Sequence, residues 1–339
     1  MVDDRIVKRA FILGAGLGKR LRPLTTALPK PLVPVWNRPL ITYAFDHLIA
    51  AGAADELVVN SHHAAGAYAQ AFPDGRYRGR ALHWSHEPEL LDTAGGLAQV
   101  APLLTGQPWA LVYNGDVLSD LPLSAAIAAH QTRAAEVTLV LRSSGPVRNV
   151  GFDPASGRVL DVRGALGVKA PIQAQFTGLY VVSPGFLRRL EPGRIESVAT
   201  VWQRMLRADA PVHGVLVDQG WWLDLGTTDA YMEAHRLLAG QARACAGGTA
   251  AAQGTLFPSY ATGLPGGVEA VLGPQVSPQA ELADGGIGLD DRTVIAAGAR
   301  VAAGAVLRQC VVWPGARVPG GVDWRDRVVL PDGTTVQAN

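Results

Sequence analysis

Short apolar runs alternate with longer amphipathic segments through the first 238 or so residues of the chain. Apolar runs with the length and composition of buried β-strands occupy residues 10–13, 56–60, 81–85, 110–113, 137–142, 178–182 and 212–217. Apolar positions at helical spacing occupy residues 40–51, 97–103, 123–132, 198–208 and 228–239. This alternation predicts an α/β fold with a mixed, mostly parallel sheet, in which ligands bind beyond the carboxyl ends of the strands.

A different pattern follows the last of these helices. Residues 240–270 are rich in Gly and Ala and predict a linker, and Gly240 is expected to cap the preceding helix. Beyond it, apolar residues recur about every six positions, at Val276, Leu282, Leu289, Ile295, Val301, Leu307 and Trp313. This period predicts a short left-handed β-helix of about two coils over residues 271–339. So small a coil buries little by itself, so it should dock on the domain formed by residues 1–239 or on another subunit.

A glycine-rich segment with two placed cations follows the first predicted strand, over residues 14–31. Three glycines at alternate positions let backbone N–H groups approach an anion, and Arg20 and Lys30 follow, the latter between two prolines. The segment therefore predicts a phosphate site. The dinucleotide-binding fingerprint does not fit, because Lys19 occupies its third glycine position, and a Walker loop does not fit, because Arg20 replaces the metal-binding Ser or Thr.

Two aspartates end apolar, strand-like runs elsewhere in the chain. Asp116 follows residues 109–115, and Asp224 follows residues 221–223. Carboxylates at strand ends suit Mg²⁺, a hard cation that takes one or two carboxylates together with substrate phosphates. The alternatives are an Asx turn at Asp116 and a capping or structural role for Asp224. Before the helix predicted at residue 97, Gly95 and Gly96 leave room for a flat ring to approach the backbone.

Taken together, these segments resemble the sugar-1-phosphate nucleotidyltransferases. Residues 14–31 match the pattern G-x-G-x-R-L-x-P-x-T followed by P-K-P. Residues 89–96 resemble the E-P-L-G-T-A-G segment of mannose-1-phosphate guanylyltransferases and the E-T-G-G-G segment of N-acetylmuramate-1-phosphate uridylyltransferases. Residues 114–116, 177–180 and 222–227 are similar to the family's N-G-D, T-G-x-Y and W-x-D-x-G-T motifs.

The resemblance implies a Rossmann-like nucleotidyltransferase domain and a role for each matching residue. It implies catalytic roles for Arg20 and Lys30, and Mg²⁺ bound by Asp116 and Asp224. The implied nucleotide-binding residues are Leu13, Gly14, Ala15, Gly16, Gly18, Glu89, Gly95, Gly96 and Asn114. The implied sugar-phosphate residues are Gly151, Lys169, Thr177 and Gly178. The chain departs from the family at Lys169, since Val-Lys-Ala-Pro replaces the Glu-Lys-Pro of thymidylyl- and glucose-specific members and lies closer to Thr177.

The implied reaction joins an NTP and a sugar 1-phosphate to give an NDP-sugar and pyrophosphate. The matching segments favour mannose 1-phosphate with GTP or an amino-sugar 1-phosphate with UTP. One alternative is a catalytically inactive paralogue that senses nucleotide-sugars, although Arg20, Lys30, Asp116 and Asp224 are all present. Another alternative is a cytidylyltransferase for a non-sugar phosphate.

Composition narrows the class of partner. Hydrophobic residues make up 48% of the 339 residues and charged residues 17%, which predicts a well-buried core, and the net charge is +1. This balance argues against a nucleic-acid partner or an anionic membrane surface. Two cysteines form no disulfide framework and fit a reducing compartment, and no apolar run has the length of a membrane span. We therefore expect a cytoplasmic protein.

Overall fold

A computed structural model describes residues 8–246 and 275–338. The chain forms two compact units, which we call unit 1 (residues 1–17 and 43–222) and unit 2 (residues 18–42 and 223–339). The predicted division into 1–239, 240–270 and 271–339 stays a prediction, and most of its linker lies outside the described residues.

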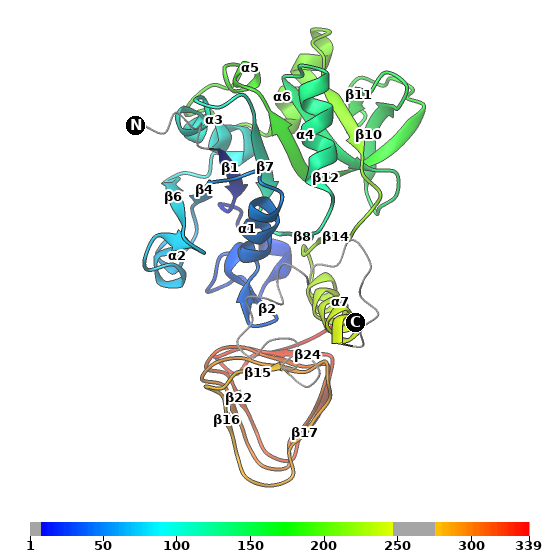
Figure 1. The fold of residues 1–339 in the computed structure, drawn as a ribbon. Helices are drawn as coiled ribbons and strands as arrows, with labels where there is room; N and C mark the ends of the chain where they lie inside the picture. The colour runs from blue at the N-terminus through cyan, green and yellow to red at the C-terminus, as the bar shows by residue number, and fades with distance from the viewer. Residues whose placement is uncertain (1–7, 247–274, 339) are drawn as a thin grey trace. The chain divides into compact units, whose positions relative to one another are not determined.

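Unit 1 is built on a ten-stranded sheet with the strand order β10-β11-β13-β9-β12-β7-β1-β4-β6-β5 (Figure 1). The predicted strands are present as β1 (Arg9–Leu13), β4 (Glu56–Ser61), β6 (Arg80–His86), β7 (Ala110–Asn114), β9 (Val137–Arg142), β12 (Ile172–Val182) and β13 (His213–Leu216). The prediction did not include β5 (Arg76–Tyr77), β8 (Val117–Ser119), β10 (Arg148–Asp153) and β11 (Arg158–Val162).

The sheet is mixed, as predicted, but less of it is parallel than we expected. Strands β7, β1, β4 and β6 pair in parallel, as do β9 and β13. The long strand β12 runs antiparallel to both β7 and β9, and β10 and β11 add further antiparallel pairs. The prediction erred because an apolar run such as that of β12 does not reveal the direction of its strand, and because β10 and β11 lack a clear apolar run and were not identified as strands.

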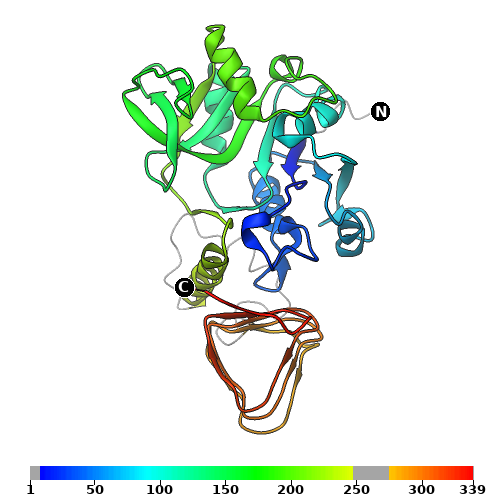
Figure 2. The same cartoon turned by 180° about the vertical axis from the view of Figure 1, so that it is seen from behind.

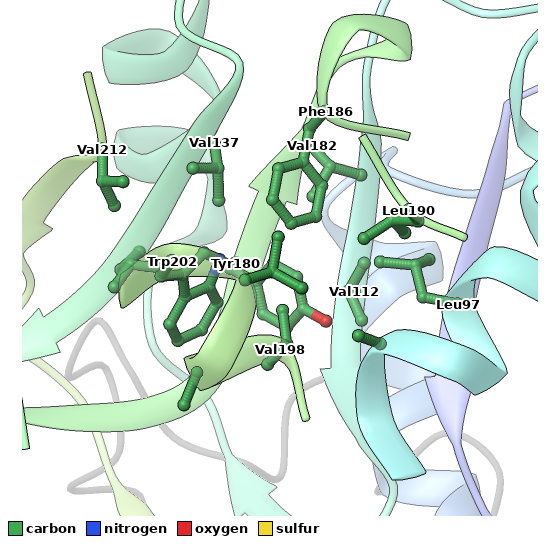
Figure 3. Packing of buried hydrophobic residues seen from close by; sticks show 14 of the residues in the cluster. Leu97, Val112, Val137, Tyr180, Val182, Phe186, Leu190, Val198, Trp202 and Val212 are labelled. Carbon is green, nitrogen blue, oxygen red and sulfur yellow. The ribbon is translucent and has the colours of Figure 1, made fainter. Parts of the chain in front are cut away.

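Helices cover both faces of this sheet: α1 (Ile41–Ala50), α2 (Gly66–Ala71), α3 (Asp92–Leu104), α4 (Leu123–Thr132), α5 (Pro184–Leu187) and α6 (Val198–Arg207). Residues of α3, α5 and α6 pack with the strands into one hydrophobic core (Figure 3). There Trp202 meets Phe176 and Tyr180 edge to face, with ring centroids 5.2 and 5.4 Å apart. Helix α4 covers the opposite face. Its His130 side chain forms a hydrogen bond with the Thr138 hydroxyl, and Thr138 points to the other side of β9 from Val137 and Leu139, which belong to that core.

Unit 2 contains the 3₁₀ turns η1 (Lys19–Leu21) and η2 (Lys30–Leu32), the hairpin of β2 (Pro34–Val35) and β3 (Arg38–Pro39), β14 (Trp222–Asp224) from Leu223 on, and helix α7 (Thr228–Ala246). Helix α7 runs past Gly240, so the predicted cap at that glycine is wrong. A single glycine inside a helix costs about 1 kcal/mol, which the rest of a long helix can offset.

The C-terminal strands of unit 2 wind into stacked triangular coils, whose sides form three parallel sheets (Figure 2). Successive coils contain β15 (Gln275–Val276), β16 (Glu281–Leu282) and β17 (Gly288–Leu289), then β18 (Val294–Ile295), β19 (Arg300–Val301) and β20 (Val306–Arg308), then β21 (Val311–Val312), β22 (Arg317–Val318) and β23 (Asp323–Arg325). Strand β24 (Arg327–Val329) begins a further coil and pairs with the antiparallel β25 (Thr335–Gln337). There are therefore more coils than the two predicted.

The register of the coils corrects the predicted six-residue period at one point. Ile295 pairs with Val312, Val301 with Val318 and Leu307 with Trp324. The position after Leu307 is therefore taken by Val312, five residues on, and not by Trp313. Apolar residues at 311, 312 and 313 made the register ambiguous in the sequence, because each could continue the pattern.

The coils dock on other parts of unit 2. The Trp313 indole N–H donates to the Tyr231 hydroxyl of α7 at 3.1 Å, and that hydroxyl donates to the Pro34 carbonyl of β2 at 2.5 Å. The Asn37 amide donates to the carbonyls of Gln275 and Ile295, each at 3.2 Å. The expected docking on the same chain is thus present. The helices within residues 8–246 include none that is long and apolar enough to cross a membrane.

Candidate functional site

The predicted site residues fall into two groups, one in each unit. In unit 2, Arg20, Lys30 and Asp224 lie together although almost two hundred residues separate the last two. The Lys30 ammonium lies 3.4 Å from one Asp224 oxygen, and the Arg20 guanidinium lies 4.0 Å from the other. The Lys30 side chain is 8% exposed and that of Arg20 is 74% exposed. A sheltered cation and an open cation therefore flank one carboxylate.

Local structure places Lys30 in this group. Pro29 precedes the 3₁₀ turn η2 as its cap, and Pro31 stands inside the turn, so the backbone on both sides of Lys30 is restricted. Gly18 has a φ of 58°, and a Cβ there would lie 2.9 Å from the Thr25 side chain and 3.2 Å from the Cβ of Lys30. Only glycine lets the loop pass so close to Lys30 in this conformation.

In unit 1, the glycine loop begins at Gly14, whose backbone is bonded at both polar atoms. Its N–H donates to Asn60 Oδ1 at 2.7 Å, and its carbonyl accepts from the Tyr68 hydroxyl at 2.9 Å. A Cβ at Gly14 would lie 2.6 Å from the Asn60 carbonyl, whereas at Gly16 it would meet no atom of the described residues within 4 Å. Packing therefore requires glycine at 14, while the space beside Gly16 is open.

The segment predicted to meet the base differs from our expectation in its local structure. Helix α3 starts at Asp92 and not at residue 97, so Gly95 and Gly96 lie inside its first turns. Thr93 also lies inside the first turn, and its hydroxyl accepts from the Val198 N–H at 2.8 Å. The space that a Cβ would fill at Gly95 is taken by the Arg194 carbonyl, 2.3 Å away. Two adjacent glycines looked like helix breakers, but buried contacts hold them in the helix.

Two buried polar residues next to this segment were missed. Glu87 is 0% exposed and Asn60 is 2% exposed. Asn60 Nδ2 donates to Glu87 Oε1 at 2.6 Å, and the Leu91 N–H donates to Glu87 Oε2 at 3.0 Å. Our prediction chose Glu89, which is exposed. The available signal was the position of Asn60 at the carboxyl end of a predicted strand, the same criterion that selected Asp116.

The N-G-D and T-G-x-Y motifs meet in unit 1 near the end of β7, together with Trp222, the first residue of the W-x-D-x-G-T motif. A Cβ at Gly178, where φ is 82°, would lie 2.8 Å from the Asn114 amide. The Trp222 indole donates to the Thr177 carbonyl at 2.7 Å. Asn114 also faces Leu13 in the register of β7 and β1. The end of β7, directly before Asp116, is thus bordered by residues predicted for both the nucleotide and the sugar phosphate.

Lys169 lies on a loop that is organised by a buried carboxylate. Asp161, 4% exposed, accepts from the N–H groups of Leu166 and Val168 at 3.2 and 3.3 Å. Gly151 packs against the end of this loop, since a Cβ there would lie 3.0 Å from the Cβ of Ala170. Lys169 itself is exposed. The two predicted sugar-phosphate positions, Gly151 and Lys169, therefore belong to one part of unit 1.

The donor chemistry of the two predicted metal ligands fits Mg²⁺, because both are carboxylates. Asp116 is half-buried directly after β7, and Asp224 is the residue that ends β14. Among residues 8–246 and 275–338, no group of three or more His, Cys, Asp or Glu side chains could hold a metal. An ion here would therefore depend on few protein ligands and on substrate oxygens, as Mg²⁺ usually does in phosphate chemistry. Joint coordination by Asp116 and Asp224 stays a prediction.

Comparisons with known proteins agree with the motifs. The model of the nucleotidyl transferase family matches residues 9–241. The chain is 31% identical to the mannose-1-phosphate guanylyltransferase of Mycobacterium tuberculosis over 92% of this chain and 81% of that protein. It is 35% identical to the N-acetylmuramate alpha-1-phosphate uridylyltransferase of Neisseria meningitidis over 68% of this chain and 97% of that protein.

Solved structures with the same fold are more distant in sequence. The UDP-glucose pyrophosphorylase of Acinetobacter baumannii superimposes with a TM-score of 0.55 at 19% identity, covering 67% of this chain and 92% of that one. HddC from Yersinia pseudotuberculosis, complexed with GMP-PN, gives a TM-score of 0.54 at 17% identity, covering 67% of this chain and 97% of that one. At these identities the likeness concerns the fold alone.

Proposed function

Because the chain belongs to the nucleotidyl transferase family, we propose that it transfers a nucleotidyl group from an NTP to a sugar 1-phosphate, releasing pyrophosphate. The observation that carries this proposal is the grouping of Arg20, Lys30 and Asp224 in unit 2. The named activities of relatives from Mycobacterium tuberculosis and Neisseria meningitidis also support it.

In this reaction a sugar phosphate oxygen attacks the α-phosphorus of the NTP in line, so no protein nucleophile is needed. Catalysis is positioning and charge neutralisation. The sheltered ammonium of Lys30 would stabilise the charge that grows on the α-phosphate, since a preorganised cation acts more strongly away from water. The open guanidinium of Arg20 would hold the β- and γ-phosphates, which leave together. The loop from Gly14 to Gly18, with Ala15 and Gly16, would surround the triphosphate.

We propose Mg²⁺ as the cofactor, with Asp116 and Asp224 as its protein ligands. When bound, the ion would neutralise negative charge on the reacting phosphates. The ion pairs at Asp224 are compatible with this role, because a carboxylate that is 41% exposed keeps an oxygen surface open to an incoming cation. The sugar phosphate would meet Gly151, Lys169, Thr177 and Gly178, and the base would meet Glu89, Gly95, Gly96 and Asn114.

The substrate pair is proposed at the level of class. The relatives named above support mannose 1-phosphate with GTP or an amino-sugar 1-phosphate with UTP. We also propose that the C-terminal coils are a left-handed β-helix, that they are the contact surface if the protein forms a homo-oligomer, and that the protein acts in the cytoplasm. The winding follows the hexapeptide period, and the location follows the cysteine content.

The deciding experiment incubates the purified protein with Mg²⁺, each NTP and a panel of sugar 1-phosphates, and measures pyrophosphate release. We expect release with a guanosine or uridine triphosphate and one sugar phosphate, and its loss in Lys30→Ala. Nucleotide-sugar binding without pyrophosphate release under every pairing would favour the inactive sensing paralogue. Release only with CTP and a non-sugar phosphate such as phosphocholine would favour the cytidylyltransferase.

A further inference from the structure

We propose that Asn60 and Glu87 are positioning residues that hold the glycine loop in the conformation that accepts the NTP. They do so through a buried series of hydrogen bonds that runs from Gly14 to the start of α3. All of its members lie in unit 1. The inference rests on the proposed function, because it assumes that the loop after Gly14 binds a nucleoside triphosphate.

The first step of the argument is that the Gly14 peptide groups are held at both ends. Asn60 Oδ1 accepts the Gly14 N–H at 2.7 Å, and the Tyr68 hydroxyl donates to the Gly14 carbonyl at 2.9 Å. Gly14, Asn60 and Tyr68 are all buried. Turning either peptide group would leave a buried donor or acceptor unpaired, which proteins strongly avoid. The direction in which the chain leaves β1 toward Gly16 is thereby set.

The second step is that Glu87 decides which way the Asn60 amide points. The two ends of an amide have nearly the same shape, so only their partners distinguish them. Glu87 Oε1 accepts the Asn60 Nδ2 group at 2.6 Å. The opposite end of the amide, Oδ1, must then face the Gly14 N–H. The second carboxylate oxygen accepts the Leu91 N–H at 3.0 Å, which connects the loop to the residue before α3.

The third step concerns the glycines. A Cβ at Gly96 would lie 2.6 Å from both Asn60 Nδ2 and Glu87 Oε1, and a Cβ at Gly14 would lie 2.6 Å from the Asn60 carbonyl. Two glycines from separate predicted nucleotide motifs thus make room for the same asparagine. The series therefore joins the phosphate-binding loop to the segment expected to meet the base. A small change in the loop's direction would misplace backbone N–H groups that must lie within hydrogen-bond reach of phosphate oxygens.

The experiment uses the nearly equal shapes of Asn and Asp and of Gln and Glu, which allow hydrogen-bond donors and acceptors to be exchanged without changing the packing. Asn60→Asp places a second carboxylate against Glu87, and Glu87→Gln leaves one donor facing another, so each single variant breaks the series. The double variant Asn60→Asp with Glu87→Gln restores it. The introduced aspartate accepts from Gly14 and from the introduced glutamine, which turns its oxygen to the Leu91 N–H. The double variant carries the same single charge as the wild type.

A matched control is offered by a side chain that bonds to the amino end of β1, the strand that ends directly before Gly14. Gln107, 5% exposed, accepts from the Arg9 N–H at 2.5 Å and donates to the Arg9 carbonyl at 2.6 Å. Gln107→Glu makes the same kind of isosteric change to a buried amide, but this amide bonds to the amino end of β1, away from Gly14. It reports what a loss of stability alone does to nucleotide binding.

The readout is the dissociation constant of the full-length protein for Mg²⁺-GTP and Mg²⁺-UTP, measured by calorimetry, with melting temperatures alongside. We expect each single variant to bind about tenfold more weakly, as one unpaired buried group implies. The double variant should return to near the wild-type constant, and Gln107→Glu should melt earlier without losing affinity. Unchanged affinity in the single variants, or no recovery in the double variant, overturns the proposal. Because the assay needs no sugar phosphate, an inactive wild type that binds nucleotide refutes the proposed reaction and leaves this test intact.

Discussion

The two groups of predicted site residues are held by different interactions. In unit 1, Gly14, Asn60 and Glu87 are joined by short hydrogen bonds and are almost fully buried. In unit 2, Arg20 and Lys30 approach Asp224 at 4.0 and 3.4 Å, and all but Lys30 are substantially exposed. Buried hydrogen bonds determine geometry, whereas looser ion pairs keep charges available for a ligand. In the group around Gly14, substitutions that exchange a hydrogen-bond donor for an acceptor should therefore matter most, and in the group around Asp224, substitutions that remove a charge should matter most.

The largest expected effect is on Lys30. Lys30→Ala removes a sheltered cation that acts mainly on the transition state, so turnover should fall by roughly 10²-fold or more. The fold should persist, because the partner Asp224 is 41% exposed and can be hydrated. Steady-state kinetics and circular dichroism measure the two effects. Lys19→Ala, a neighbouring exposed charge in the same loop, is the control and should cost far less. Near-normal turnover in Lys30→Ala would remove Lys30 from the mechanism.

The next effect concerns the proposed metal ligands. Asp116→Asn and Asp224→Asn keep the shape of the side chain and remove its charge. Activity should fall by more than about tenfold in both, with a higher Mg²⁺ concentration needed for half-maximal rate. Titration of the rate with Mg²⁺ measures this. Unchanged Mg²⁺ dependence in either variant would show that its aspartate is not a ligand, and would leave a structural role for it.

A smaller effect is the response of stability to acid. Burial lowers the pKa of His235 in α7 to about 3, with the Pro34 carbonyl offsetting part of the shift. Burial likewise lowers the pKa values of His47 and His130 in unit 1 to about 4. The unfolded chain then binds more protons below pH 6.5, so stability should fall with acidification by up to about 1.4 kcal/mol per pH unit for each histidine.

Denaturant unfolding between pH 7 and pH 5 tests the histidines. His235→Leu should reduce the slope of the unfolding free energy against pH by up to about 1.4 kcal/mol per pH unit, because the buried ring is neutral in the folded state. A variant with the wild-type slope would mean that His235 does not contribute. Comparing it with His130→Leu separates the acid response of unit 2 from that of unit 1.

The smallest effect is expected where the coils meet α7. Trp313→Phe keeps the aromatic ring and removes the hydrogen bond to the Tyr231 hydroxyl, which should cost about 1 kcal/mol. Thermal unfolding measures the change. Activity should stay at the wild-type level, because neither residue is part of the proposed site. Equal stability of the variant and the wild type would show that packing, and not this bond, holds the coils on the helix.

The parts of the fold that followed from the sequence are those with a strong local signal. Strands β1, β4, β7 and β9 were predicted within one residue at each end, because buried parallel strands are continuous apolar runs. Strands β10 and β11 were missed, since polar and apolar residues mix in them, so that neither shows a continuous apolar run. The start of α3 was missed because glycine is locally unfavourable in helices, and only the contacts with Arg194, Asn60 and Glu87 explain it.

The sequence by itself determined the family, through motifs whose glycines, prolines and charges restrict the backbone wherever they occur. It also determined which charged residues to test. Two cations follow the glycine-rich segment and two aspartates end strand-like runs, namely Arg20, Lys30, Asp116 and Asp224. Only the tertiary structure decided that Lys30 meets Asp224, and that Asn60 and Glu87 support Gly14. The reason is physical. A restricted backbone is a local property of the chain, whereas the partner of a buried polar group depends on which strands the sheet brings side by side.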